Sequence, residues 1–179
     1  ALLKQWREKG YVQIPNAVPA SVLDEILAEQ DHAWQTADSA YRVQTGHADF
    51  TRPRPDIRYQ TGCRLLDVYT KFDAACAAIF SRKLTHFLRL IFDRDLLAFQ
   101  SLSFEVGSQQ AIHQDTAYVV TASPLEFAGV WIALDEAMDG LDVQTKRYAI
   151  EAIRKRVEGL LILVDHSTEI KEMFESIVD

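Results

Sequence analysis

Cysteine is scarce in this 179-residue chain, which has only Cys63 and Cys76. Neither their number nor their spacing fits a disulfide-stapled secreted domain or a zinc site, so we expect a reducing, cytoplasmic environment. No apolar run approaches the roughly 18 residues that cross a bilayer, and no basic-then-apolar signal peptide opens the chain. The sequence therefore predicts a cytoplasmic protein that does not associate with membranes.

Acidic residues outnumber basic ones, which gives the chain a net charge of -7 and a pI of about 5.2. This balance excludes a surface built for nucleic acid or anionic lipid, since phosphate binding depends on Lys and Arg. The chain as a whole would not attract an acidic ligand electrostatically, so such a ligand would need a basic residue in its binding site. With 48% hydrophobic and 25% charged residues, the composition is that of one globular domain with a substantial core.

The pattern of apolar residues changes along the chain. Residues recurring at steps of three and four predict helices over 2–9, from an N-cap at Ser21, over 73–80, over 83–92 and over 148–164, with a short last helix over 168–178. Strands are expected over 11–14, 97–106, 111–120 and 127–134. Helices followed by adjacent strands indicate an α+β fold with an antiparallel sheet or barrel.

The segment between about Ser39 and Thr61 has no clear period. Thr51-Arg-Pro-Arg-Pro55 is incompatible with a helix interior or a central strand. We therefore expect a long irregular loop, and such loops in compact domains are often functional. Residues 42–60 are our candidate for a substrate lid.

The pair His113 and Asp115 is the clearest chemical signal. Residues two apart on a strand point to the same face, so the imidazole and the carboxylate would project together. They would form two corners of a 2-His-1-carboxylate site, which holds Fe(II) and leaves positions for cosubstrate and dioxygen. The alternative is an exposed polar pair at a strand end.

Three stretches around this pair, Phe99–Gly107, Ala111–Thr116 and Gly129–Ala137, together resemble the phytanoyl-CoA dioxygenase family. The N-terminal stretch Gly10–Pro19, followed by an amphipathic helix, is similar to the same family. The resemblance covers roughly residues 1 to 138. It implies N-terminal helices and a partial double-stranded β-helix, a cupin-like jelly roll, followed here by a C-terminal helical tail.

The resemblance also implies an Fe(II)- and 2-oxoglutarate-dependent oxygenase that hydroxylates a small organic substrate. His113 and Asp115 would bind the iron, and Trp131 and Gln100 would lie near 2-oxoglutarate, with Ser103 facing the same cavity. The plainer alternatives are a core aromatic for Trp131 and a solvated strand face for Gln100 and Ser103. His32 and His86, in helices, and His47, in the polar loop, are interpreted as surface or capping residues.

The family pattern is incomplete after residue 140. Family members carry a second His in a Pro-Gly-Ser-His-like turn and then an Arg that binds the distal carboxylate of 2-oxoglutarate. Neither motif occurs here, and His166, the only later histidine, is a weak candidate for the third ligand beside its interpretation as a helix-end residue. We expect residues 1–140 to form the family domain and 141–179 a helical tail of uncertain origin.

Three interpretations of this break stay open: an excerpt of a longer protein, a truncation whose tail helix caps the open barrel, or a degenerate relative. In the last case the scaffold would act without catalysis as a binding or oligomerisation module. A barrel that lacks strands exposes sheet edges, so self-association through an edge or the tail helix is the expected partner interaction of that form.

Overall fold

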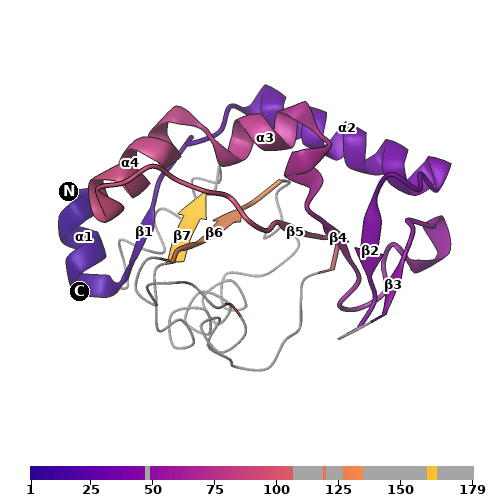
Figure 1. The fold of residues 1–179 in the computed structure, drawn as a ribbon. Helices are drawn as coiled ribbons and strands as arrows, with labels where there is room; N and C mark the ends of the chain where they lie inside the picture. The colour runs from indigo at the N-terminus through magenta and orange to yellow at the C-terminus, as the bar shows by residue number, and fades with distance from the viewer. Residues whose placement is uncertain (47–48, 107–118, 120–126, 135–160, 165–179) are drawn as a thin grey trace, which may run out of the picture. The chain divides into compact units, whose positions relative to one another are not determined.

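The computed structural model describes residues 1–46, 49–106, 119, 127–134 and 161–164 (Figure 1). The chain divides into two compact units, one made of Ala1–Ala17 with Ile112–Asp179 and one made of Val18–Ala111. Both helices and strands are present among the described residues, so the α+β class is confirmed.

The first unit begins with helix α1 (Leu2–Lys9), which ends at Gly10. Gly10 has a φ of 72°, and its N–H donates to the carbonyl of Trp6. A left-handed C-terminal residue of this kind is the usual position for glycine, because it has no Cβ to clash. The turn leads directly into strand β1 (Tyr11–Gln13), as the sequence predicts.

Three strands from distant parts of the chain form the sheet of this unit. Strand β7 (Leu161–Val164) lies between β1 and β6 (Gly129–Ile132), and both pairings are parallel. The predicted helix over 148–164 is therefore wrong at its last four residues, which are a central strand. The remainder of that helix and the helix over 168–178 lie outside the described residues. The domain boundary at residue 140 stays a prediction, although β7 comes from beyond it.

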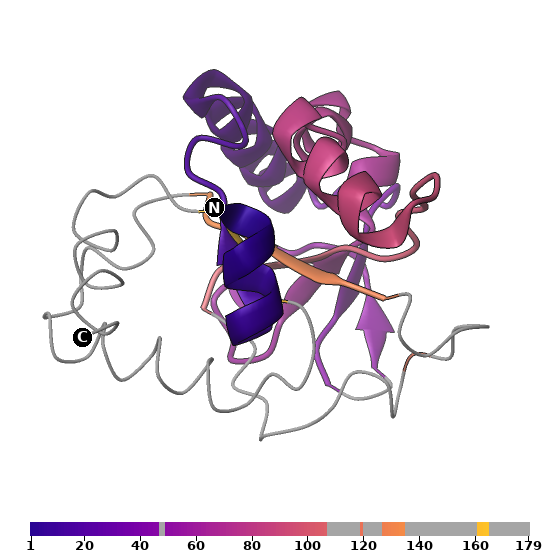
Figure 2. The ribbon, with the colours of Figure 1, turned by 90° about the vertical axis from the view of Figure 1, so that its left-hand side faces the viewer.

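The second unit combines helices with an antiparallel sheet in the order β3-β2-β4-β5. Its helices are α2 (Ala20–Thr36), α3 (Asp73–Ile79) and α4 (Arg82–Phe92), with short 3-10 turns η1 (Pro55–Ile57) and η2 (Val68–Thr70). Its strands are β2 (Arg42–Gln44), β3 (Phe50–Thr51), β4 (Arg64–Leu66) and β5 (Leu102–Phe104). Helices α2 and α3 lie on one side of this sheet in both views (Figures 1 and 2).

The core of the second unit lies between its helices and its sheet. Trp34 of α2, Leu65 of β4 and Val43 of β2 are at most 1% exposed. Phe72, 2% exposed, packs its ring 5.0 Å from that of Tyr41. Apolar burial of this extent is the main source of stability in a domain of this size.

Several expected boundaries differ from the structure. Helix α2 starts at Ala20 after Pro19, so Ser21 lies in the first turn and is not the N-cap. The strand expected over 97–106 is reduced to Leu102–Phe104. The long loop is also wrong as predicted, because β2, β3 and η1 all fall within it. Within residues 42–60, our candidate lid, β2 is a paired central strand.

Within the described residues the strands form one parallel and one antiparallel sheet, and the expected strand over 111–120 lies almost entirely outside them. No helix in the part of the chain that the structure describes has the length and apolar character to cross a membrane.

Candidate functional site

The two predicted iron ligands, His113 and Asp115, lie outside the described residues, as does His166. Among the residues that are described, no group of three His, Cys, Asp or Glu side chains is arranged to hold a metal. His32 and His86 are exposed, as predicted for surface histidines, while His47 is outside the described part.

The chemistry of the predicted donors suits iron. An imidazole and a carboxylate are the ligands that non-haem Fe(II) sites use, whereas thiolates favour zinc or copper. Cys63 is buried, and burial raises the pKa of its thiol, so this side chain stays a neutral thiol. That state is a poor metal ligand, because the thiolate is the binding form.

Gln100, the predicted cosubstrate contact, lies just before β5 and is exposed. Hydrogen bonds hold the backbone both before and after Gln100. Tyr69 donates its hydroxyl to the carbonyl of Ala98 at 3.0 Å. On the other side Ser101 donates its N–H to the Asp67 carboxylate at 3.0 Å and accepts the N–H of Asp67 at 2.8 Å. The solvent-facing amide of Gln100 is therefore presented from an anchored segment.

Trp131, the second predicted cosubstrate contact, lies on β6 in the first unit. It is 36% exposed, so it is not a fully buried core aromatic. Its backbone stands opposite Leu163 of β7. The indole is thus held on a hydrogen-bonded strand with part of its surface available to a ligand.

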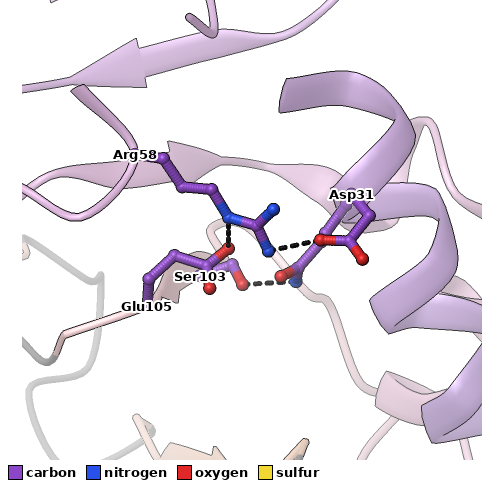
Figure 3. A network of polar contacts seen from close by, with 5 residues as sticks. Asp31, Arg58, Ser103 and Glu105 are labelled. Carbon is purple, nitrogen blue, oxygen red and sulfur yellow. Dashed lines mark hydrogen bonds and ion pairs between the residues drawn. The ribbon is translucent and has the colours of Figure 1, made fainter. Parts of the chain in front are cut away.

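A polar network joins α2 to the end of β5, with Arg58 at its centre (Figure 3). Arg58 donates from Nε to Oε1 of Glu105 at 2.9 Å and forms an ion pair with Asp31 through Nη2. Burial lowers the pKa of Arg58, but its hydrogen bonds to Glu105 and Asp31 raise it, and the net result is above the ordinary value. The guanidinium is therefore a fixed, fully charged link between the helix and the sheet.

Gln30 adds a second link beside this one. Its side-chain amide donates to the hydroxyl of Ser103 at 2.5 Å, although the residue is only 3% exposed. Ser103 consequently faces α2, and the expectation that it faces a ligand cavity is wrong. The signal in the sequence was Gln30 itself, a polar residue inside the apolar stripe of a helix, because buried amides require a partner.

Sequence reasoning missed the arginines of β2 and β4 entirely. Arg42 and Arg64 lie on adjacent strands of the antiparallel sheet, and both contact aromatic rings. The available signal was the concentration of arginine over residues 42–64 of a chain whose net charge is -7.

Comparison with protein families gives a match over residues 6–139 to the family described as phytanoyl-CoA dioxygenase (PhyH). The match includes both predicted iron ligands, Trp131 and Gln100. Comparisons with curated proteins and with solved structures find no significant match.

Proposed function

Because the chain belongs to the phytanoyl-CoA dioxygenase family, we propose that it is an Fe(II)- and 2-oxoglutarate-dependent oxygenase that hydroxylates a small organic substrate. The observation that carries the proposal is the family match, which spans residues 6–139 and contains His113-Gln-Asp115. The jelly roll that the family resemblance implies stays part of this proposal.

In this proposal His113 and Asp115 would hold Fe(II) through an imidazole nitrogen and a carboxylate oxygen, with 2-oxoglutarate as the cosubstrate. Fe(II) at such a site supplies dioxygen activation, coupled to oxidation of 2-oxoglutarate to succinate and carbon dioxide. Trp131 provides an apolar wall for the cosubstrate, which limits water at the reacting atoms. Gln100 offers an amide that can donate to a carboxylate oxygen.

Removal of a ligand tests the assignment. Asp115→Ala should abolish Fe(II)-dependent release of succinate, because a single imidazole holds the metal far more weakly than an imidazole with a carboxylate. Asp24→Ala is the matched control, since Asp24 is an exposed carboxylate on α2. Succinate release that survives in Asp115→Ala would refute the ligand assignment.

Anaerobic titration with Fe(II) and 2-oxoglutarate gives a second readout that does not require the substrate. The wild-type chain should develop the visible metal-to-ligand absorption band of the ternary complex, and Asp115→Ala should not. His166→Ala decides whether the later histidine contributes, because a third ligand would weaken Fe(II) binding when removed.

A non-catalytic role is the second candidate, favoured by the sequence after residue 139. No Pro-Gly-Ser-His-like turn occurs there, and no arginine follows His166 in this sequence, although Arg147, Arg154 and Arg156 precede it. In this alternative the scaffold binds a partner or a second copy through a sheet edge, such as β3 or β5 at the ends of the described antiparallel sheet. Sedimentation velocity over a concentration series tests it: self-association without iron-dependent turnover supports it, and a catalytically active monomer excludes it.

A further inference from the structure

The antiparallel sheet of the second unit has two chemically different faces. Its register places Val43, Leu65 and Ser103 directly opposite one another. Val43 and Leu65 are 0% exposed, and Ser103 accepts the hydrogen bond from Gln30 of α2. This row therefore faces the helix layer.

Side chains alternate between faces along each strand, so the residues on either side of this row point away from α2. One such row runs across all four strands through Phe50, Gln44, Arg64 and Phe104. The next runs through Arg42, Leu66 and Leu102. We call these seven residues the arginine face.

The two arginines of this face are held by aromatic rings. The guanidinium carbon of Arg42 lies 4.8 Å from the ring centroid of Phe50, and that of Arg64 lies 5.7 Å from the ring centroid of Phe104. Arg64 also donates from Nε to Oε1 of Gln44 at 3.0 Å. Contact with a ring engages the face of a guanidinium and leaves N–H groups at its edge for a ligand.

Neither Arg42 nor Arg64 forms an ion pair within the part of the chain that is described here. Arg58, only six residues before Arg64, pairs with two carboxylates. The difference follows from position, because Glu105 is on the helix side of β5 whereas Phe104 is on the arginine face. Two positive charges are thus concentrated on a surface of a protein whose net charge is -7.

Apolar surface accompanies the charge. Phe50 is 53% exposed and Leu102 is 39% exposed. Exposed aromatic and aliphatic groups, beside arginines that form no ion pair with the described residues, are suited to a ligand that has an acidic end and an apolar body. Two arginines are too few for nucleic acid in an acidic chain.

We propose that the arginine face binds a small organic carboxylate, with Arg42 and Arg64 on the carboxylate and Phe50, Phe104 and Leu102 against its apolar part. The inference goes beyond the proposed oxygenase function and does not depend on it. Carboxylate is the natural partner, because the guanidinium fork matches its two oxygens.

Phenylacetate and its uncharged counterpart phenylacetamide are suitable probes, because they differ in charge and hardly in shape. Isothermal titration of the full chain without added metal should show phenylacetate binding about tenfold more tightly than the amide, as charge-assisted hydrogen bonds imply. Arg64→Gln and Arg42→Gln should each weaken phenylacetate binding about tenfold and leave the amide unaffected.

Arg82→Gln is the matched control, because it removes the same charge from an exposed position at the start of α4. It should bind both probes like the wild-type chain. Arg64→Lys should retain part of the preference for phenylacetate, since it keeps the charge and loses the fork. Thermal melting of each variant verifies that the fold is intact.

Equal binding of the two probes, or equal binding of phenylacetate by Arg64→Gln and Arg82→Gln, overturns the proposal. Tighter binding of 2-oxoglutarate than of phenylacetate, lost in Arg64→Gln, also overturns it, because the site would then belong to the cosubstrate.

The titration needs no metal, so the two proposals can fail separately. Probe binding without preference in a chain that releases succinate contradicts only the carboxylate site on the arginine face. Carboxylate-dependent binding in a chain that forms no Fe(II)–2-oxoglutarate complex contradicts only the oxygenase function.

Discussion

Replacing Arg58 by alanine should destabilise the chain more than any other single arginine removal in residues 42–64. The substitution breaks both ion pairs of the network and leaves Glu105, whose side chain is only 19% exposed, without its cation. An unpaired and largely buried carboxylate is the costly product of this change.

The loss of stability expected for Arg58→Ala follows from the exposure of Arg58 and of the two carboxylates that it pairs with. Arg58 and Glu105 are 16% and 19% exposed, so their charge-assisted hydrogen bond is expected to contribute about 1.5–3 kcal/mol. Asp31 is 52% exposed, and solvent screening reduces its contribution to about 0–1 kcal/mol. The sum is about 1.5–4 kcal/mol, equivalent to a fall in Tm of roughly 3–16 °C for a chain of this length.

Thermal and urea unfolding followed by circular dichroism measure this effect. Arg54→Ala is the control, because Arg54 pairs with Asp56 on the surface, where the side chains are 48% and 69% exposed. Its cost should stay below about 1 kcal/mol. If Arg58→Ala and Arg54→Ala lower stability equally, the network does not join α2 to the sheet in the way described.

Three further substitutions probe the second unit. Leu65→Ala, at a position 0% exposed, should cost about 2–5 kcal/mol in urea unfolding, and a cost below 1 kcal/mol would contradict the core assignment. Gln30→Ala should cost about 1–2 kcal/mol by removing the amide that Ser103 binds; an unchanged urea midpoint would show that this bond contributes nothing. The pKa of Glu29 is raised by burial and then by Asp73 and Glu25, so its contribution to stability is full below the unfolded pKa and is lost as pH rises through the folded pKa. Glu29→Gln should therefore raise Tm at about pH 7 and not at about pH 4, and an equal gain at both would exclude the electrostatic cause.

Local patterns in the sequence predict α1 and α4. Helices α1 and α4 have apolar residues at helical spacing, and Gly10 marks the end of α1. The strand over 11–14 is predicted because Val12 and Ile14 fall on one face of an extended chain, and the structure has it over Tyr11–Gln13. These features depend on neighbours within a few positions.

The elements that the sequence predicts wrongly depend on residues that are far apart along the chain. Leu161–Val164 is a run of four apolar residues, which suits a buried parallel strand as well as a helix, and only its distant partners decide between the two. Strands β2 and β3 have three and two residues, too few for an alternating pattern to be visible. The arginine face depends on the register of four strands, which no local rule supplies.

The prediction of the iron site depends on different evidence from the prediction of the fold. His113 and Asp115 were selected by a spacing of two and by the surrounding family motifs, and the family match supports the motifs. The ligand geometry stays a prediction, because these residues lie outside the described part of the chain.

The position of β7 has a consequence for how the protein is made. Strand β1 pairs with residues roughly 150 positions later, and β6 reaches β1 only through β7. During synthesis β1 therefore cannot pair with β7 until residues 161–164 have left the ribosome. Such a strand is open to premature pairing with other chains, so a chaperone that shields it is expected to raise the yield of native protein.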